Sequence, residues 1–234
     1  NSKLFYCSLT GSNYNESNKS ERLQEFRSFC KEENIQFTVA SDNLETDLRK
    51  ELMDFLPDAI FLPTCVDWHI EHRKINYVSS RVLEHLNCCV TIVWYQITVP
   101  ICEQFINLCT PLSKVEQTNK WNTFIKHYKT QIHIPILRFK YLERLLEFEN
   151  DCFAAEAYMA MSINEFKGFV RKLASREIEQ KLDSLVLHIN DLRRIEAESA
   201  DIYLDLVANS SQVSDHRVVR PRPVGGEASS SKNL

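Results

Sequence analysis

The sequence predicts an α/β protein, built as a three-layer sandwich with a mainly parallel sheet and followed by a C-terminal helical extension. The first observation behind this prediction is the alternation of β-type and helical patterns from residue 3 to residue 95. The second is the run Ala-Ile-Phe-Leu at 59–62, which has no polar alternation. Such a run is typical of a strand that a parallel sheet buries on both faces.

The first half of the chain supplies the strands of this sandwich. The four predicted strands cover residues 3–10, 35–39, 59–62 and 88–95. The helices between them begin near Ser20 and cover 46–55 and 69–86. In a sheet of this kind ligands bind outside the carboxyl ends of the strands. We therefore expect the chemistry in the loops 10–20, 40–43, 63–69 and 94–100.

Beyond Pro111 the pattern becomes helical. The expected helices cover 114–131, 136–161 and a charged stretch at 165–207. Apolar residues in that stretch step by four and three over about two heptads: Ile178, Leu182, Leu185, Ile189 and Leu192. Because this is short for a coiled coil, we expect a helix that folds back on the core or pairs in a hairpin, with the seam of a homo-oligomer as the alternative.

The composition at the end of the chain changes again. Residues 209–234 contain almost no large apolar side chains, which predicts a disordered tail. The expected organisation is thus a main domain at 1–163, a helical extension at 164–208 and the tail at 209–234.

Charge and hydropathy exclude several classes of partner. The chain has 28 basic and 32 acidic residues, a formal net charge of −4. It therefore lacks the excess of positive charge that proteins use to bind nucleic acids or anionic membranes. The longest apolar stretch, at 88–95, is far shorter than the ~20 residues of a membrane span. We therefore expect a cytoplasmic protein with no membrane span and no nucleic-acid partner.

The eight cysteines lie mostly inside apolar runs rather than in a framework of loops. None of them forms a C-x-x-C pair, so a thiolate zinc site or a thioredoxin-type redox site has no support. Buried free thiols are the better interpretation.

The segment with the clearest chemistry is Asp67-Trp-His-Ile-Glu-His-Arg73, which follows the apolar strand and opens a helix. His69 and His72 are three residues apart and therefore share one face of the first helical turn. Imidazole suits Zn²⁺, and Asp67 or Glu71 could orient a ring through its second nitrogen. A catalytic zinc needs about three protein ligands, so two histidines are an incomplete site. The alternative is a polar helix start with two solvated histidines.

Several blocks resemble the PIG-L/LmbE family of zinc-dependent deacetylases. Pro57-Asp-Ala-Ile-Phe-Leu-Pro63 followed by Asp67-x-His69-x-Glu71-His72-Arg73 resembles that family's P-D-x-x-x-x-P and D-x-H-x-D-H-R segment. Other blocks appear in the family's order: Thr10-Gly11, Arg22-x-x-Glu25, Asp42, Lys120 with Tyr128-x-Thr130-Gln131, and Ala155-Glu156-Ala157-Tyr158. The resemblance covers roughly residues 3–161 and implies a Rossmann-like sandwich.

This resemblance implies the hydrolysis of an N-acetyl amide on an amino sugar, such as an N-acetylglucosamine conjugate, with zinc as the cofactor. By position, His72 would be a metal ligand and His69 would stabilise the tetrahedral intermediate. Asp67 would orient an imidazole through its second ring nitrogen. Arg22 and Asp42 would contact hydroxyl groups of the sugar.

The family's first block, an A-H-P-D-D-E stretch that supplies two metal ligands and the general base, has no counterpart in this sequence. The count of 4 glycines, where average usage predicts ~16, and Asn1 in first place agree with a missing glycine-rich turn. We therefore expect an N-terminally incomplete member, possessing one of the three ligands.

Two further hypotheses belong to other functional classes. A non-catalytic carbohydrate-binding or scaffolding relative would use 165–207 as its partner surface. A nucleotide-binding protein lacks support because neither G-x-G-x-x-G nor G-x-x-x-x-G-K-[ST] occurs. A serine hydrolase lacks support because there is no G-x-S-x-G elbow.

Overall fold

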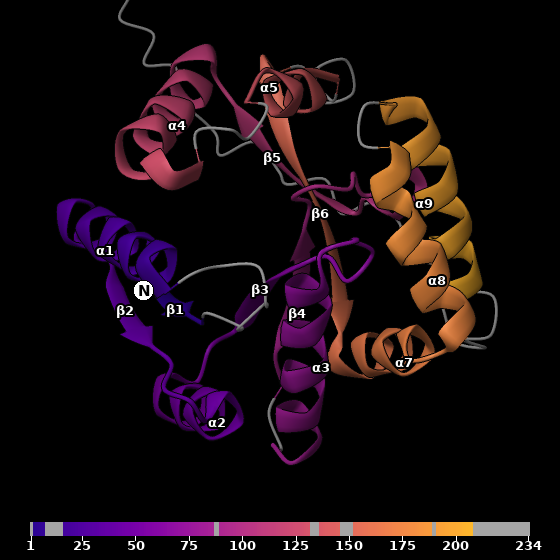
Figure 1. Ribbon diagram of the computed structural model, residues 1–234, viewed down its shortest axis with the longest axis horizontal. Helices are drawn as coiled ribbons and strands as arrows, with labels where there is room; N and C mark the ends of the chain where they lie inside the picture. Colours follow the sequence, from indigo (N-terminus) through magenta and orange to yellow (C-terminus); the bar gives the residue numbers. More distant parts are fainter. Residues whose placement is uncertain are drawn as a thin grey trace, which may run out of the picture.

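The computed structural model describes residues 2–7, 16–86, 89–131, 136–145, 152–188 and 191–207, and within them it is an α/β structure with two sheets. The smaller sheet pairs β1 (Lys3–Tyr6) with β2 (Gln36–Val39) in parallel, and α1 (Glu16–Glu32) lies between them in the chain. In Figure 1 this sheet lies to the left of the larger one. The predictions for Thr10-Gly11 and for the tail at 209–234 concern residues outside the described ranges.

The larger sheet has the strand order β3-β4-β6-β5. Its strands are β3 (Ala59–Pro63), β4 (Thr91–Tyr95), β5 (Leu108–Leu112) and β6 (Ala154–Ser162). β3 and β4 are parallel, whereas β6 runs antiparallel to both β4 and β5. The larger sheet is therefore mixed, and the expectation of a mainly parallel sheet is correct only for β1–β2 and β3–β4.

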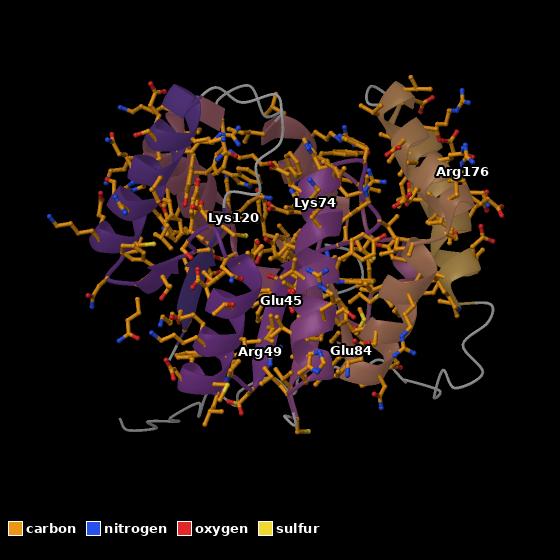
Figure 2. The ribbon with its side chains drawn as sticks, turned by 60° about the horizontal axis from the view of Figure 1, so that its bottom comes forward. Glu45, Arg49, Lys74, Glu84, Lys120 and Arg176 are labelled. Carbon is orange, nitrogen blue, oxygen red and sulfur yellow. The ribbon has the colours of Figure 1, made fainter. Side chains whose placement is uncertain are left out.

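The predicted helices of the first half are present. α2 (Leu44–Phe55) begins at Asn43, whose side chain accepts a hydrogen bond from the Thr46 backbone N–H at 3.2 Å. α3 (Ile70–Glu84) connects β3 to β4. An ion pair of 3.0 Å between Arg81 on α3 and Glu45 on α2 joins these helices, which Figure 2 shows side by side.

One expected helix, at 136–161, is wrong over its second half. The chain forms α5 (Ile136–Leu145) and then the strand β6. Alanine, glutamate and methionine favour a helix in isolation, but in β6 the buried side chains alternate, with Ala155, Ala157, Met159 and Met161 all buried. Pairing with β4 and β5 on both sides outweighs the local preference.

Two details of the strands also differ from expectation. β5 was not predicted, because Pro111 interrupts its pattern; proline is accommodated there since β5 is an edge strand. β3 was expected to be buried on both faces, yet Phe61 is 57% exposed and Ala59 is exposed, while Leu62 and Pro63 are buried. The reason is that β3 is the other edge of this sheet.

The remaining helices of the second half flank these strands. α4 (Lys114–His127) starts with a capping box formed by Ser113 and Glu116. Three short 3₁₀ turns complete the described elements: η1 (Glu103–Phe105), η2 (Lys129–Gln131) and η3 (Leu185–His188).

The charged stretch at the end folds back on the core, as predicted. It forms α7 (Ile163–Leu173), α8 (Arg176–Ser184) and α9 (Leu192–Val207), which stand at the right of Figure 1. Of the apolar seam, Ile178, Leu182 and Leu185 are buried in one core cluster with Leu62 and Trp94 of the sheet. The core is therefore continuous across the predicted boundary at residue 163.

Within the described ranges, no helix combines the length and the apolar character that a membrane crossing requires.

The seven described cysteines are all free, as expected, but only Cys30 and Cys65 are fully buried.

Candidate functional site

A buried carboxylate begins the histidine segment, residues 67–73. Asp67 is fully buried just beyond the carboxyl end of β3. Its oxygens accept hydrogen bonds from Nδ1 of His72 at 3.0 Å, from Oγ1 of Thr98 at 2.6 Å and from the backbone N–H of His69 at 2.9 Å. Burial by itself raises the pKa of Asp67, but the hydrogen bond and charge of His72 and the other donors outweigh it, so the pKa is lowered. The carboxylate is therefore held in its ionised form.

His72 is oriented by this carboxylate. Because Asp67 is a hydrogen-bond acceptor, Nδ1 of His72 carries the proton of the bond and Nε2 is left as the ring atom with a free lone pair. His72 is half-buried and lines a cavity of about 1610 Å³. A carboxylate behind an imidazole is the arrangement that orients metal-binding histidines, and it equally suits a histidine that accepts a proton.

His69 lies next to His72 at the N-cap of α3. The two ring centroids are 5.1 Å apart. Desolvation is the main cause that lowers the pKa of His69; the charge of Asp67 opposes it, and that of His72 adds to it. His69 is therefore mostly neutral at pH 7, and its exposed ring does not belong to the cavity lining.

The cavity has a volume of about 1610 Å³ and lies between β1 and β3. Residues from both strands line the cavity. Glu71 and His72 of α3, which belong to the histidine segment, line it as well. Lys120 of α4 and Glu156 and Tyr158 of β6 also line the cavity. The cavity runs along β1 and β3 and includes their carboxyl ends, where the sequence predicts ligand binding.

The two predicted sugar contacts are placed differently. Arg22 lies on α1, and its positive charge contributes to the lowering of the pKa of His69. Asp42 is exposed after β2 and is not among the residues that line the cavity. Neither Arg22 nor Asp42 is therefore among the residues that line the cavity.

Lys120 is the centre of a charged cluster that lines the cavity, and Figure 2 shows its position. Its Nζ forms ion pairs with Glu143, at 2.5 Å, and with Glu156. Burial raises the pKa of Glu156, but the bond and charge of Lys120 outweigh it, so the pKa is lowered. The hydroxyl of Tyr158 donates to Glu156 at 2.7 Å. The four groups hold one another in place beside the cavity.

Residues from separate blocks of the motif resemblance therefore meet in space. Lys120 contacts Glu156, as described. In addition, the backbone N–H and the hydroxyl of Thr130 donate to the carboxylate of Glu25 at 2.8 and 2.6 Å. These pairs are 36 and 105 residues apart in the sequence.

Sequence reasoning missed several residues that support the site. Thr98 lies in one of the loops singled out, at 94–100, but no motif marked it. Asn76 is fully buried and joins three elements: it donates to the carbonyls of Pro63 and His72 at 2.8 and 2.7 Å, and accepts from Nε1 of Trp94 at 2.8 Å. The sequence does not mark Asn76 as a residue that supports the site, because asparagine on a helix is ordinarily solvated.

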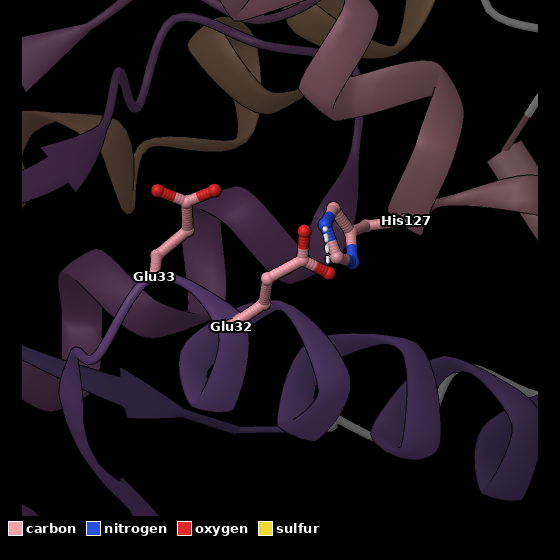
Figure 3. A group of neighbouring side chains, drawn as sticks. All are labelled: Glu32, Glu33 and His127. Carbon is pink, nitrogen blue, oxygen red and sulfur yellow. Dashed lines mark ion pairs between the residues drawn. The ribbon is translucent and has the colours of Figure 1, made fainter.

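Another group of possible metal ligands lies outside the histidine segment, and one of its members, Glu33, also lines the cavity. Figure 3 shows Glu32 and Glu33 at the end of α1 beside His127 of α4. One ligand atom from each lies within 4.8 Å of the others, but Glu32 already pairs with Lys126 and, at 3.4 Å, with His127. Among the described residues this is the only such group of three, so His69, Asp67 and His72 do not form a complete three-ligand site by themselves.

The candidate site thus consists of a buried carboxylate, an imidazole oriented by it, a second imidazole and a cavity between two strand edges. It resembles a partial metal site in its donor types and lacks further ligands among the described residues. Comparison of the chain with models of protein families and with curated proteins found no match.

Proposed function

We propose that this chain carries part of the active site of a zinc-dependent deacetylase of the PIG-L/LmbE type, which hydrolyses the N-acetyl amide of an amino-sugar conjugate. The observation that carries the proposal is the bond between Asp67 and His72 at the edge of the cavity. It leaves Nε2 of His72 as the metal-binding atom and fixes the ring that bears it. The other ligands and the general base have to come from outside the described residues.

The residues present have separate tasks in this proposal. Asp67 keeps Nδ1 of His72 protonated and the ring in one orientation. His69, neutral at pH 7, is available as a polar partner for the charge that develops on the amide oxygen. Arg22 and Asp42 would bind hydroxyl groups of the sugar. Zinc, when bound, lowers the pKa of a water molecule and polarises the amide carbonyl.

Contacts between the motif blocks support the proposal. A random scatter of short motifs has no reason to bring Lys120 to Glu156 and Glu25 to Thr130. The proposal includes the finer fold, in which the two sheets belong to one three-layer Rossmann-like sandwich. It also includes a cytoplasmic location, because seven free cysteines suit a reducing compartment.

The main alternative is a non-catalytic carbohydrate-binding or scaffolding relative. The incomplete ligand set favours it. However, the apolar seam that it would offer to a partner is largely used within the chain, since Ile178, Leu182 and Leu185 are buried. We therefore rank it second.

Zinc binding tests the ligand assignment directly. Equilibrium dialysis against Zn²⁺ of the chain extended at its N-terminus by the A-H-P-D-D-E stretch should detect a site that His72→Gln weakens at least tenfold and that Asp67→Asn weakens about tenfold, as expected when the carboxylate behind a ligand is lost. His85→Gln, at the exposed C-cap of the same helix, is the matched control and should bind as the wild type does. His127→Gln shows whether zinc instead occupies the group with Glu32 and Glu33.

Activity is tested by restoring the missing block. An N-terminal extension that carries the A-H-P-D-D-E stretch should allow release of acetate from an N-acetylglucosamine conjugate, and His72→Gln in the extended protein should abolish it. Zinc affinity that is unchanged by His72→Gln in the extended protein would show that the ligand assignment is wrong. Zinc binding without acetate release would instead favour the non-catalytic alternative.

A further inference from the structure

Two strand edges face each other across the cavity. In the described part of the chain β1 pairs only with β2, and β3 pairs only with β4, so one edge of each strand is unpaired. The cavity of about 1610 Å³ is lined by residues 2–7 along β1 and 59–63 along β3. The unpaired edges are therefore the two walls of one slot.

The two strands run in the same direction along this slot. At the carboxyl end of β1, Cys7 lines the cavity together with Glu71 and Tyr95. Tyr95 pairs with Pro63 at the carboxyl end of β3. At the amino end, Lys3 forms an ion pair with Glu51 of α2, the helix that leads into β3.

The backbone N–H and C=O groups of β1 and β3 alternate in the same way with odd and even residue numbers. In parallel sheets the N–H and C=O groups of successive residues point to opposite sides of the strand. The bonds Ala40 N–H to Tyr6 C=O, at 2.8 Å, and Thr64 N–H to Tyr95 C=O, at 2.9 Å, show that the even-numbered residues of β1 and β3 face their own partners.

The odd-numbered residues therefore turn their backbone groups toward the slot: Lys3, Phe5, Ala59 and Phe61. Pro63 has no N–H, and its carbonyl accepts from Asn76 at 2.8 Å, so the free edge of β3 ends there. Each side of the slot is therefore a short row of backbone donors and acceptors. A strand that lies between the two rows can form hydrogen bonds to both.

We propose that a parallel β-strand of about five residues occupies this slot and joins the two sheets into one. Its side chains are apolar on both faces, because apolar residues of helices on either side line the slot, among them Leu48, Leu52, Ile75, Phe29 and Phe124. At a rise of about 3.3 Å per residue such a strand spans about 17 Å. Its carboxyl end arrives beside Glu71 and His72.

The order of strands identifies the source of this strand. From β1 the chain moves outward to β2, crosses the slot to β3 and then moves outward to β4. In a doubly wound sheet with the order 3-2-1-4-5, the central position belongs to the strand that comes first in the chain. The occupant is therefore a segment that precedes β1 in the same polypeptide, joined to it by a crossover helix.

Segments within the 234 residues do not fit the slot. The stretches outside the described ranges contain no apolar run of five residues; 208–234 has Val218-Val219 between two charged residues, and 132–135 is Ile-His-Ile-Pro. This inference rests on backbone geometry and topology, and it does not require the proposed catalysis.

The test uses the protein from its natural source. Intact mass and N-terminal sequencing should show a form heavier than 27.4 kDa, with an apolar run of about five residues and a helical segment ahead of β1. Hydrogen exchange followed by NMR should then show amides of Phe5 and Phe61 at least tenfold slower in this form than in the 234-residue chain. The amides of Tyr6 and Leu62, which already pair within their sheets, are the internal controls.

Each result decides the matter. A natural protein of 27.4 kDa, or a longer one whose Phe5 and Phe61 amides exchange as fast as in the 234-residue chain, would overturn the proposal. A longer form with both amides protected but without zinc binding would support the strand and refute the catalytic proposal, so the two failures are distinguishable.

Discussion

Arg73, the last residue of the histidine segment, donates a hydrogen bond from Nη2 to the carboxylate of Asp183 on α8 at 2.6 Å. Arg73 is only 7% exposed, and its Nη1 has no partner among the described residues. The pair connects residues 110 positions apart. The C-terminal helices thus hold the start of α3 as well as covering the sheet.

Asp183→Asn should destabilise the protein by about 1–2 kcal/mol, because it removes the counter-charge of a nearly buried guanidinium. The estimate is modest because the Asp183 side chain is itself 65% exposed. The free energy of unfolding in urea measures the effect. Asp205→Asn is the matched control: it breaks the exposed pair with Lys181 and should cost less than 1 kcal/mol. Equal losses in both variants would contradict the structural role of Arg73.

Asp67 makes stability depend on pH in a defined direction. Its pKa in the folded chain lies below that of the unfolded chain, about 3.9. The stabilisation is therefore fully present above about pH 5 and is lost as the pH falls through 3.9 to the lower folded value. Asp67→Asn should cost about 3 kcal/mol at pH 7, where hydrogen bonds to a charged group are lost.

Urea unfolding between pH 3 and pH 7 measures this dependence. The difference between wild type and Asp67→Asn should shrink below pH 4. Asp42→Asn, at an exposed carboxylate, should leave the curve unchanged. A difference that stays constant down to pH 3 would show that Asp67 is not the ionised centre of the site.

Asn76 and Trp94 should be coupled. Asn76→Leu leaves Nε1 of Trp94 and two carbonyl oxygens without their partner and should cost about 2–4 kcal/mol. In the background of Trp94→Phe, which removes the donor, the same change should cost at least 0.5 kcal/mol less. A double-mutant cycle of unfolding free energies measures the coupling, and additive losses would argue against the buried network.

Cys7 should react slowly with thiol reagents. Burial, with a smaller contribution from Glu71, raises its pKa to about 11. At pH 8 the fraction of thiolate is then about 200-fold below that of an ordinary cysteine with a pKa near 8.5. Iodoacetamide labelling followed by mass spectrometry should modify the exposed Cys89 first and Cys7 at least 100-fold later. Comparable rates would mean that the carboxyl end of β1 is open to solvent.

Much of the architecture of the first half could be predicted from local pattern. The amphipathic spacing of Leu23, Phe26 and Phe29 located α1, and the polar segment before α3 located the helix start. The error at 136–161 arose because Ala154–Ser162 is composed of helix formers, and only pairing with β4 and β5 makes it a strand. Chain periodicity does not report which neighbours a segment will meet.

The sequence by itself determined the order of the main helices and of the first four strands, the proximity of His69 and His72 and the availability of Asp67 as a partner, because these depend on spacing along one or two elements. Only the tertiary structure decided that Thr98 donates to Asp67, that Lys120 meets Glu156 and that β1 and β3 face each other across a cavity. These relationships join residues 31 or more positions apart. They arise from packing and strand pairing between distant segments, for which local propensity carries no information.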